Sequence, residues 1–350
     1  MMEIKGVIKY LCFLIFSISI ITACSYRIKE IPRDIEMPKL GLITVLETAG
    51  DKCNVYRAES GGLYKIGSGM PKAGDMTYNS STVVQLAAIA NGQNLEHNNI
   101  KIYMKEKMLV LDSFYSASDL CLNPSGSKLA YRSYKEDSLE SAQGLKIFDI
   151  NARKLINLKS KVLVSGNVYC WLDDNNIIYY GSTGEKQDSG RIYQYDLQNN
   201  TEKVYLDNID GYCTYMVPAG KGLVYMKENE NGSELLYFND GGNTVLSREI
   251  SRVYKARYLN NFDKIFFTGM ENGVEEPELY SISLKGGNLS RITYDFPGTM
   301  DTGSNICFDK QGNIYFTALQ GVYMYNLPDN SVNLISTHNG KYSVYQNIQN

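Results

Sequence analysis

The chain of 350 residues carries 35 lysines and arginines against 38 aspartates and glutamates, so its net charge at pH 7 is -3. This mild acidity argues against a nucleic-acid-binding protein, which needs a basic surface for the phosphates. Hydrophobic residues make up 43% and charged residues 21% of the chain, which is ordinary for a folded globular protein. The 28 tyrosines, against 11 phenylalanines and 1 tryptophan, favour half-buried strands.

The first residues have the pattern of an export signal. Lys5 and Lys9 precede an apolar run at residues 11–21. A transmembrane helix needs about 20 apolar residues, so this run is short for one. A basic start followed by a short apolar run and small residues is typical of a secretory signal peptide.

The signal ends in Ile-Thr-Ala-Cys at residues 21–24, which resembles a bacterial lipobox. The resemblance implies a lipoprotein signal peptide of residues 1–23 and a diacylglyceryl thioether on Cys24, with an uncleaved anchor as the alternative. We therefore expect acyl chains, palmitate among them, to hold the protein in the cell membrane on its extracytoplasmic side. Residues 24–40 are predicted to form an extended tether, because prolines interrupt them.

Residues 41–350 are predicted to form a single all-β domain built from a repeated unit. Each unit has four short apolar strands separated by polar turns, and no segment after residue 24 has the pattern of an amphipathic helix. The second strands of five units follow one another at steps of 49, 46, 42 and 48 residues; they lie at 126–133 (GSKLAYRS), 175–182 (NNIIYYGS), 221–228 (KGLVYMKE), 263–270 (DKIFFTGM) and 311–318 (QGNIYFTA). Four strands in a period of roughly 40 to 50 residues are the signature of a β-propeller, in which stacked blades bury one another's faces.

Two fainter units precede these five, which favours a propeller of seven blades, with six as the alternative. Residues 54–68 are predicted to be two inner strands around a Gly-Gly turn, and residues 81–113 another blade. Residues 42–47 are predicted to complete the last blade and so close the ring, which would remove open sheet edges.

Two stretches resemble the repeats of TolB-type propellers. LNPSGSKLAY at 122–131 is similar to the turn between first and second strands in that family, and ELYSISLKGGNLSRIT at 278–293 is similar to the end of its repeat. The similarity covers residues 117–336 well and the part before them poorly, and Ser125 and Ser283 stand where the family prefers aspartate. The same repeats occur in the N-terminal propellers of prolyl-oligopeptidase-like enzymes, but this chain has no G-x-S-x-G nucleophile motif. The resemblance therefore implies a fold and leaves the function open.

Five cysteines remain beyond the signal and Cys24: Cys53, Cys121, Cys170, Cys213 and Cys307. All except Cys53 fall in predicted first strands, where a small apolar side chain suits a crowded interior. We expect buried free thiols, with disulfides as the alternative, and no C-x-x-C spacing indicates a metal or redox site. Trp171 is likewise expected to pack in the core.

No catalytic or cofactor-binding motif is recognisable, so the sequence predicts neither an enzyme nor a cofactor or metal site. The two histidines, His97 and His338, are predicted to lie in polar loops. The stretches 172–176 and 228–234 are rich in oxygen ligands but lack the spacing of a calcium loop, so we expect tight turns. A lyase, lactonase or glycosidase that uses acidic residues at the central channel is the alternative.

Acidic residues are concentrated in the loops between second and third strands, at 133–144, 182–190, 227–234 and 270–278. In the resembling propellers these loops lie on one face. They hold three lysines and twelve acidic residues: Glu136, Asp137, Glu140, Glu185, Asp188, Glu228, Glu230, Glu234, Glu271, Glu275, Glu276 and Glu278. Such a field can steer cationic partners, although charge also keeps exposed loops soluble. The predicted function is a membrane-anchored binding module that docks an envelope protein, peptide or glycan on this face.

Overall fold

The computed structural model describes residues 28–32, 36–59, 61–77, 82–184, 190–294, 296 and 298–346. The predicted signal peptide, Cys24, Glu185 and Asp188 lie outside these residues. Within them, regular structure apart from the strands is limited to two short 3-10 turns, η1 (Leu139–Ser141) and η2 (Asn260–Phe262). No helix in this part of the chain is long and apolar enough to cross a membrane.

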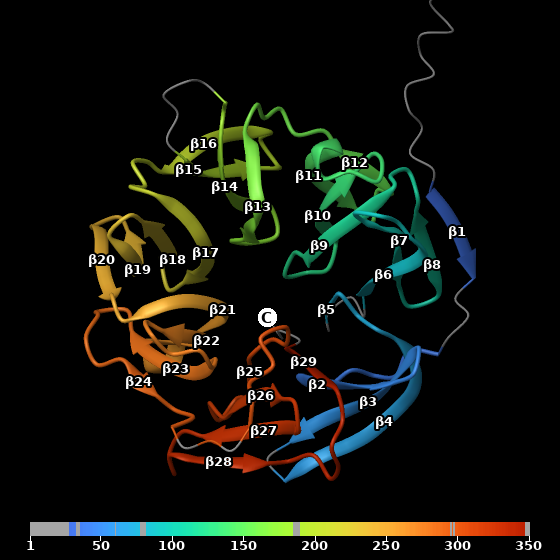
Figure 1. The fold of residues 1–350 in the computed structure, drawn as a ribbon. Coiled ribbons are helices and arrows are strands. Elements are labelled where there is room, and N and C mark those ends of the chain that lie inside the picture. Colours follow the sequence, from blue (N-terminus) through green and yellow to red (C-terminus); the bar gives the residue numbers. More distant parts are fainter. Residues whose placement is uncertain are drawn as a thin grey trace, which may run out of the picture.

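Seven antiparallel sheets are arranged as blades around a central axis, which confirms the predicted seven-bladed propeller (Figure 1). Each blade has four strands, and blade 2 carries a fifth at its outer edge. From the axis outward, blade 1 consists of β29 (Tyr342–Gln346), β2 (Ile43–Ala49), β3 (Lys52–Glu59) and β4 (Gly62–Pro71), and blade 2 consists of β5 (Asp75–Thr77), β6 (Thr82–Asn91), β7 (Glu96–Tyr103), β8 (Lys107–Leu111) and β1 (Ile28–Pro32). In the same direction, blade 3 consists of β9 (Ser116–Leu122), β10 (Lys128–Tyr134), β11 (Ala142–Asp149) and β12 (Lys154–Ile156), and blade 4 consists of β13 (Leu163–Trp171), β14 (Asn176–Ser182), β15 (Arg191–Asp196) and β16 (Thr201–Leu206).

In the remaining three blades the strands, from the axis outward, follow one another in sequence order. Blade 5 consists of β17 (Tyr212–Ala219), β18 (Gly222–Asn229), β19 (Gly232–Asn239) and β20 (Gly242–Ser247); blade 6 of β21 (Ile250–Leu259), β22 (Lys264–Glu271), β23 (Glu278–Ser283) and β24 (Ser290–Arg291); and blade 7 of β25 (Cys307–Phe308), β26 (Ile314–Ala318), β27 (Gly321–Asn326) and β28 (Ser331–Leu334). The five units predicted most clearly correspond to blades 3 to 7.

In blades 4 and 5 the second strand is the most buried, because neighbouring blades cover both of its faces. In β14 the residues from Ile177 to Gly181 are all buried, and in β18 so are those from Gly222 to Met226. One apolar cluster joins Ala130 of blade 3, Tyr179 of blade 4 and Leu223 of blade 5. The core is therefore a chain of contacts between blades, as the repeat pattern predicts.

Blade 1 combines β2, β3 and β4, from the early part of the described chain, with β29 from its end. Its innermost strand, β29, pairs with β2 in a register that places Val344 opposite Val45. The predicted closure of the ring is confirmed for Ile43 to Glu47, but these residues close it by pairing with β29 in blade 1 and do not complete blade 7, which has four strands of its own. The prediction that residues 54–68 form two inner strands is wrong: they belong to β3 and β4, the two outer strands, because β29 arrives from the far end of the sequence to take the inner position.

Part of the segment predicted as a tether is a strand. β1 adds to the outer edge of blade 2, where Ile28 pairs with Leu111 and Pro32 with Lys107. The ion pairs Lys29–Asp112 (2.7 Å) and Glu30–Lys107 (2.9 Å) link the side chains of the two strands. A proline is compatible with this position, since it lies in an edge strand with one side unpaired.

The predicted positions of four cysteines are confirmed. Cys121, Cys170, Cys213 and Cys307 lie on β9, β13, β17 and β25, the innermost strands of their blades, and all four are free thiols, as is Cys53 on β3. Burial raises the pKa of the Cys213 and Cys307 thiols to about 12. Trp171 is buried as predicted, and its indole Nε1 donates a hydrogen bond of 3.0 Å to the carbonyl oxygen of Cys121 in the neighbouring blade.

Candidate functional site

We define the top face as the end of the ring that carries the loops between second and third strands and the connections from one blade to the next. Contacts between these loops show that they share one end. The carboxylate of Asp137, in the top loop of blade 3, accepts hydrogen bonds from the backbone amides of Gln93 (2.6 Å), Asn94 (3.0 Å) and Leu95 (2.7 Å) in the top loop of blade 2. These hydrogen bonds, led by that from Gln93, lower the pKa of Asp137. Asp137 therefore anchors one top loop to the next.

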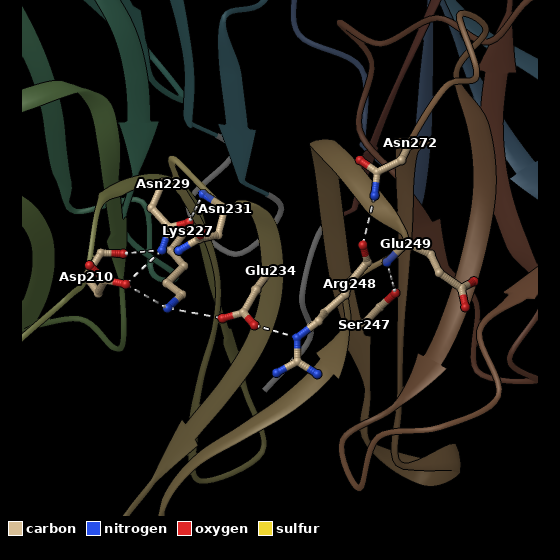
Figure 2. A network of polar contacts seen from close by, with 9 residues as sticks. All are labelled: Asp210, Lys227, Asn229, Asn231, Glu234, Ser247, Arg248, Glu249 and Asn272. Atoms are coloured by element: carbon tan, nitrogen blue, oxygen red, sulfur yellow. Dashed lines mark hydrogen bonds and ion pairs between the residues drawn. The ribbon is translucent and has the colours of Figure 1, made fainter.

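A polar network fixes the top loops of blades 5 and 6 (Figure 2). Glu234 lies at its centre, with its carboxylate 3.1 Å from Lys227 Nζ and 2.6 Å from Arg248 Nε. Hydrogen bonding to Lys227, followed by that to Arg248, lowers the pKa of Glu234. Glu234 thus joins blade 5 to the connection that leads into blade 6.

The same network extends to either side of Glu234. On the blade 5 side, Asn229 Nδ2 donates to the carboxylate of Asp210 (2.8 Å), and the backbone amide of Asn231 donates to Asn229 Oδ1 (2.9 Å). On the blade 6 side, Asn272 Nδ2 donates to the carbonyl oxygen of Arg248 (2.8 Å), as Figure 2 shows. The turn predicted within 228–234 is confirmed, since β18 and β19 form a tight hairpin there.

Glu278 does not belong to the exposed surface that the sequence predicted for it. It is the first residue of β23, only 8% exposed, and its carboxylate accepts hydrogen bonds from Arg291 and from the Thr293 hydroxyl. Thr293 Oγ1 in turn accepts a hydrogen bond of 2.9 Å from the backbone amide of Leu279. Glu278 is buried because the chain returns over it after β24, which no local pattern could show.

The other predicted acids that the structure describes remain at the surface of the top face. Glu271 is half-buried, and six are exposed: Glu136, Glu140, Glu228, Glu230, Glu275 and Glu276. The carboxylates of these six form no hydrogen bond or ion pair with any other described residue. They therefore stand unneutralised on loops that Asp137 and Glu234 hold in place.

Exposed apolar side chains gather at the same end of the ring. Among the described residues eleven large apolar side chains are exposed, and six of them lie on the top face: Ile89, Leu139, Leu163, Tyr212, Tyr294 and Leu319. Only Phe262 lies on the bottom face, and the rest lie on outer strands. Tyr212 is 72% exposed and is paired in the sheet with Glu228, so aromatic and acidic groups are neighbours there. Exposed aromatic side chains such as Tyr212 are enriched in protein interfaces.

The two histidines have different surroundings. His97 lies on β7 and not in a loop as predicted, and its ring stacks on Tyr115 with 4.7 Å between ring centroids. His338 does lie in a connection, between β28 and β29, where its Nε2 contacts the carboxylate of Glu47. Sequence reasoning missed the Glu47 cluster, whose members come from opposite ends of the chain.

A central cavity of about 1820 Å³ runs through the ring and is lined by the innermost strands. Two of its carboxylates have fixed structural partners. Asp75 accepts hydrogen bonds from the backbone amides of Leu122 (2.7 Å) and Met76 (2.8 Å), and Asp119 forms an ion pair of 2.7 Å with Arg132. Asp75 is exposed only to the cavity, so desolvation still raises its pKa to about 6.

The stretch 172–176 forms the tight turn that its composition predicts. The carboxylate of Asp173 accepts hydrogen bonds from the backbone amides of Asn175 (2.7 Å) and Asn176 (2.8 Å). Its oxygens therefore serve the turn between β13 and β14. Across the described ranges, no group of three or more His, Cys, Asp or Glu side chains is placed to hold a metal ion.

No protein-family model matches this sequence, and no curated protein sequence matches it. Solved structures do resemble the fold. The β-propeller domain of the Trilobed protease from Pyrococcus furiosus has a TM-score of 0.53 at 13% identity, over 76% of this chain and 84% of that one. An uncharacterized protein from Listeria monocytogenes has a TM-score of 0.53 at 14% identity, over 86% and 94% of the two chains. TolB from Acinetobacter baumannii has a TM-score of 0.48 at 12% identity, over 87% and 82%. At these identities the likeness shows a β-propeller fold and nothing about the ligand.

Proposed function

We propose that this protein is a lipid-anchored, extracytoplasmic binding module that docks a basic protein partner on the top face of its propeller. The proposed anchor is Cys24, after removal of a signal peptide of residues 1–23. Two acyl chains hold a protein on a membrane firmly, whereas a single chain does so only marginally.

The observation that carries the proposal is the set of exposed glutamates without a partner. Glu228 and Glu230 of blade 5, and Glu275 and Glu276 of blade 6, belong to the same two loops as residues of the network around Glu234. Because that network already uses its own cations, it fixes the loops without neutralising these four carboxylates. Fixed, unpaired charges of one sign favour a partner of the opposite sign and speed its association.

Exposed tyrosines supply the apolar contact area that the proposed docking surface needs in addition to its charge. Tyr212 and Tyr294 are 72% and 70% exposed on the same two blades. The Arg291 guanidinium lies over the Tyr294 ring, 5.4 Å from its centroid, which limits the positions that this ring can take. Tyrosine rings held in this way are frequent centres of binding energy in interfaces.

The position of β1 supports the proposal of a partner at the membrane surface. Ile28, its first residue, pairs with Leu111 at the top-face end of β8. Three residues separate Ile28 from Cys24, and an extended chain of that length reaches about 14 Å. An anchor on Cys24 would therefore keep the rim of the top face close to the membrane. A basic partner at the membrane surface fits this arrangement better than a diffusing one.

Chemical crosslinking in native membranes tests the proposal. The anchored protein is compared with the variant Glu230→Lys/Glu275→Lys/Glu276→Lys and with a matched control, Glu106→Lys/Asp240→Lys/Asp329→Lys. The control reverses three exposed acids in bottom-face loops, so both variants have the same net charge.

We expect one basic protein to be crosslinked to the unchanged chain and to the control, and to be lost from the top-face variant. Equal capture by all three would move the docking site away from the top face. Capture by none would favour the enzyme alternative and direct attention to envelope sugars.

A further inference from the structure

Three cationic side chains of one innermost strand line the central cavity. Arg252, Lys255 and Arg257 all belong to β21 of blade 6. The register of β21 against β22 shifts between Val253 and Lys255, after which pairing is regular. Lys255 and Arg257, two residues apart beyond this bulge, lie on the same side of the strand.

None of the three cations has a carboxylate partner within ion-pair distance among the described residues. Arg252 lies over the Tyr254 ring, 5.8 Å from its centroid, and Arg257 Nη1 donates to Gln346 Oε1. Lys255 Nζ has no hydrogen-bond partner in the same set of residues. By contrast, Arg132 on β10 is paired with Asp119 of the cavity wall. The cations of β21 are therefore not neutralised by an ion pair, although Glu228 and Lys221 also line the cavity without an ion pair to any described residue.

Asp75 is the carboxylate that faces Lys255 and Arg257 from blade 2. Both of its oxygens already accept backbone hydrogen bonds, from Leu122 and Met76. The positive charges of Lys255 and Arg257 oppose the rise in the pKa of Asp75 that desolvation causes. The single negative charge of Asp75 thus offsets only part of the positive charge of Lys255 and Arg257. One more anionic group would complete the charge balance.

Each innermost strand has one edge without a strand partner: β21 pairs only with β22, β17 only with β18, and β9 only with β10. Side chains already use part of these edges, because Trp171 donates to the carbonyl oxygen of Cys121 on β9 and the Ala256 amide of β21 donates to the Tyr215 hydroxyl. Other backbone groups of β17 and β21 can pair with an added extended chain in the cavity. A glycan has no peptide backbone and would form fewer regular hydrogen bonds with such edges than an extended peptide.

We propose that the central cavity binds the carboxyl-terminal end of an extended peptide, whose carboxylate is held by Lys255 and Arg257. The peptide backbone lies along the edges of β17 and β21 that have no strand partner. A guanidinium and an ammonium together can surround a carboxylate with charge-assisted hydrogen bonds. Glu228 of the top face also lines this cavity, but Glu230, Glu275 and Glu276, which the docking test changes, do not, so either test can fail without the other.

The site has a definite pH dependence. The groups facing Asp75 are Lys255 and Arg257 from β21, Tyr345 from β29 and Cys121 from β9. Asp75 is the member of this group whose pKa is about 6. As the pH falls through 6, Asp75 loses its charge and no longer repels the bound carboxylate, so peptide binding becomes tighter.

The test uses a pool of acetylated pentapeptides with free carboxyl termini and an identical pool ending in carboxamides. Saturation-transfer NMR with the folded propeller identifies binders, and calorimetry gives the Kd of the strongest one at pH 5 and pH 7.5. The informative variant is Lys255→Gln, because Lys255 supports no other described residue. The matched control is Lys285→Gln, on an exposed bottom-face loop of the same blade.

We expect binding from the carboxylate pool alone, a loss of roughly tenfold or more in affinity in Lys255→Gln, and no change in Lys285→Gln. Arg257→Gln is expected to weaken peptide binding as well. The unfolding midpoint of this variant shows whether loss of the contact with Gln346 also destabilises the fold. Equal binding of both pools, or equal affinity of Lys255→Gln and the unchanged protein, would overturn the proposal. So would preferential binding of trigalacturonate with the same dependence on Lys255, because the site would then take an acidic sugar.

Discussion

The carboxylate at the centre of the cluster that closes the ring is buried, whereas the network between blades 5 and 6 extends from the partly buried Glu234 to the exposed Arg248. In blade 1, Glu47 is 7% exposed and accepts hydrogen bonds from Tyr56 (2.7 Å), Asn54 (2.9 Å) and Tyr342 (3.3 Å), besides its contact with His338. In the second region the Arg248 side chain is 69% exposed.

The difference shows that similar contacts serve different purposes. The Glu47 cluster joins β2 and β3, from the start of the described chain, to β29 and the residues before it, from the end. Breaking it leaves buried donors without an acceptor, which is costly. Breaking the exposed network returns its groups to water, so its value lies in holding loops in position.

The largest expected effect comes from Glu47→Gln. The amide keeps the volume of the side chain but loses the charge and one acceptor oxygen, so we expect a loss of about 2 to 4 kcal/mol in the free energy of unfolding. Urea denaturation measures this change, with Glu230→Gln as a surface control. A loss as small as that of the control would show that blade 1 does not depend on this cluster.

Acid titration sharpens the same point. Desolvation raises the pKa of Glu47, but hydrogen bonds from Asn54, Tyr56 and His338 outweigh it and lower the pKa to about 2, from a usual 4.5. Because the folded-state pKa is depressed, the stabilisation is present above pH 4.5 and is lost as the pH falls toward 2, by on the order of 3 kcal/mol. The measurement is the difference in unfolding free energy between the unchanged protein and Glu47→Gln across this range. A difference that stays constant with pH would contradict the assignment.

The smallest expected effect is that of Arg248→Gln. Its ion pair with Glu234 is exposed to water, so we expect the free energy of unfolding to fall by at most about 1 kcal/mol. Urea denaturation again provides the measurement. A loss as large as that of Glu47→Gln would remove the distinction between the two regions.

Sequence reasoning could predict what repeats and could not predict what joins distant segments. Blades 3 to 7 follow from apolar strands at regular steps, and the cysteines of the inner strands follow from the same register. Blade 1 was assigned wrongly in part, because its inner strand lies almost 300 residues from the strands beside it. Contacts such as His338–Glu47 leave no local pattern.

The same distinction applies to the acidic loops of the candidate site. Composition shows that the top loops are acidic, but it does not show which acids are used within the fold. Asp137 and Glu234 are neighbours of exposed glutamates in sequence, yet their carboxylates serve loop contacts. Glu278 lies two positions after Glu276 and is buried, because the chain returns over it after β24. Only the three-dimensional arrangement separates structural acids from available ones.

Carboxyl-selective footprinting tests the central claim most directly. The exposed acids are labelled with a water-soluble carbodiimide and an amine, once on the purified protein and once on intact native membranes, and the extent of labelling is compared residue by residue. The proposed docking predicts that Glu228, Glu230, Glu275 and Glu276 lose reactivity in the membrane sample while Asp240 and Asp329 keep theirs. Equal labelling of the top-face glutamates in both samples, or protection of the bottom face alone, would contradict docking on the top face.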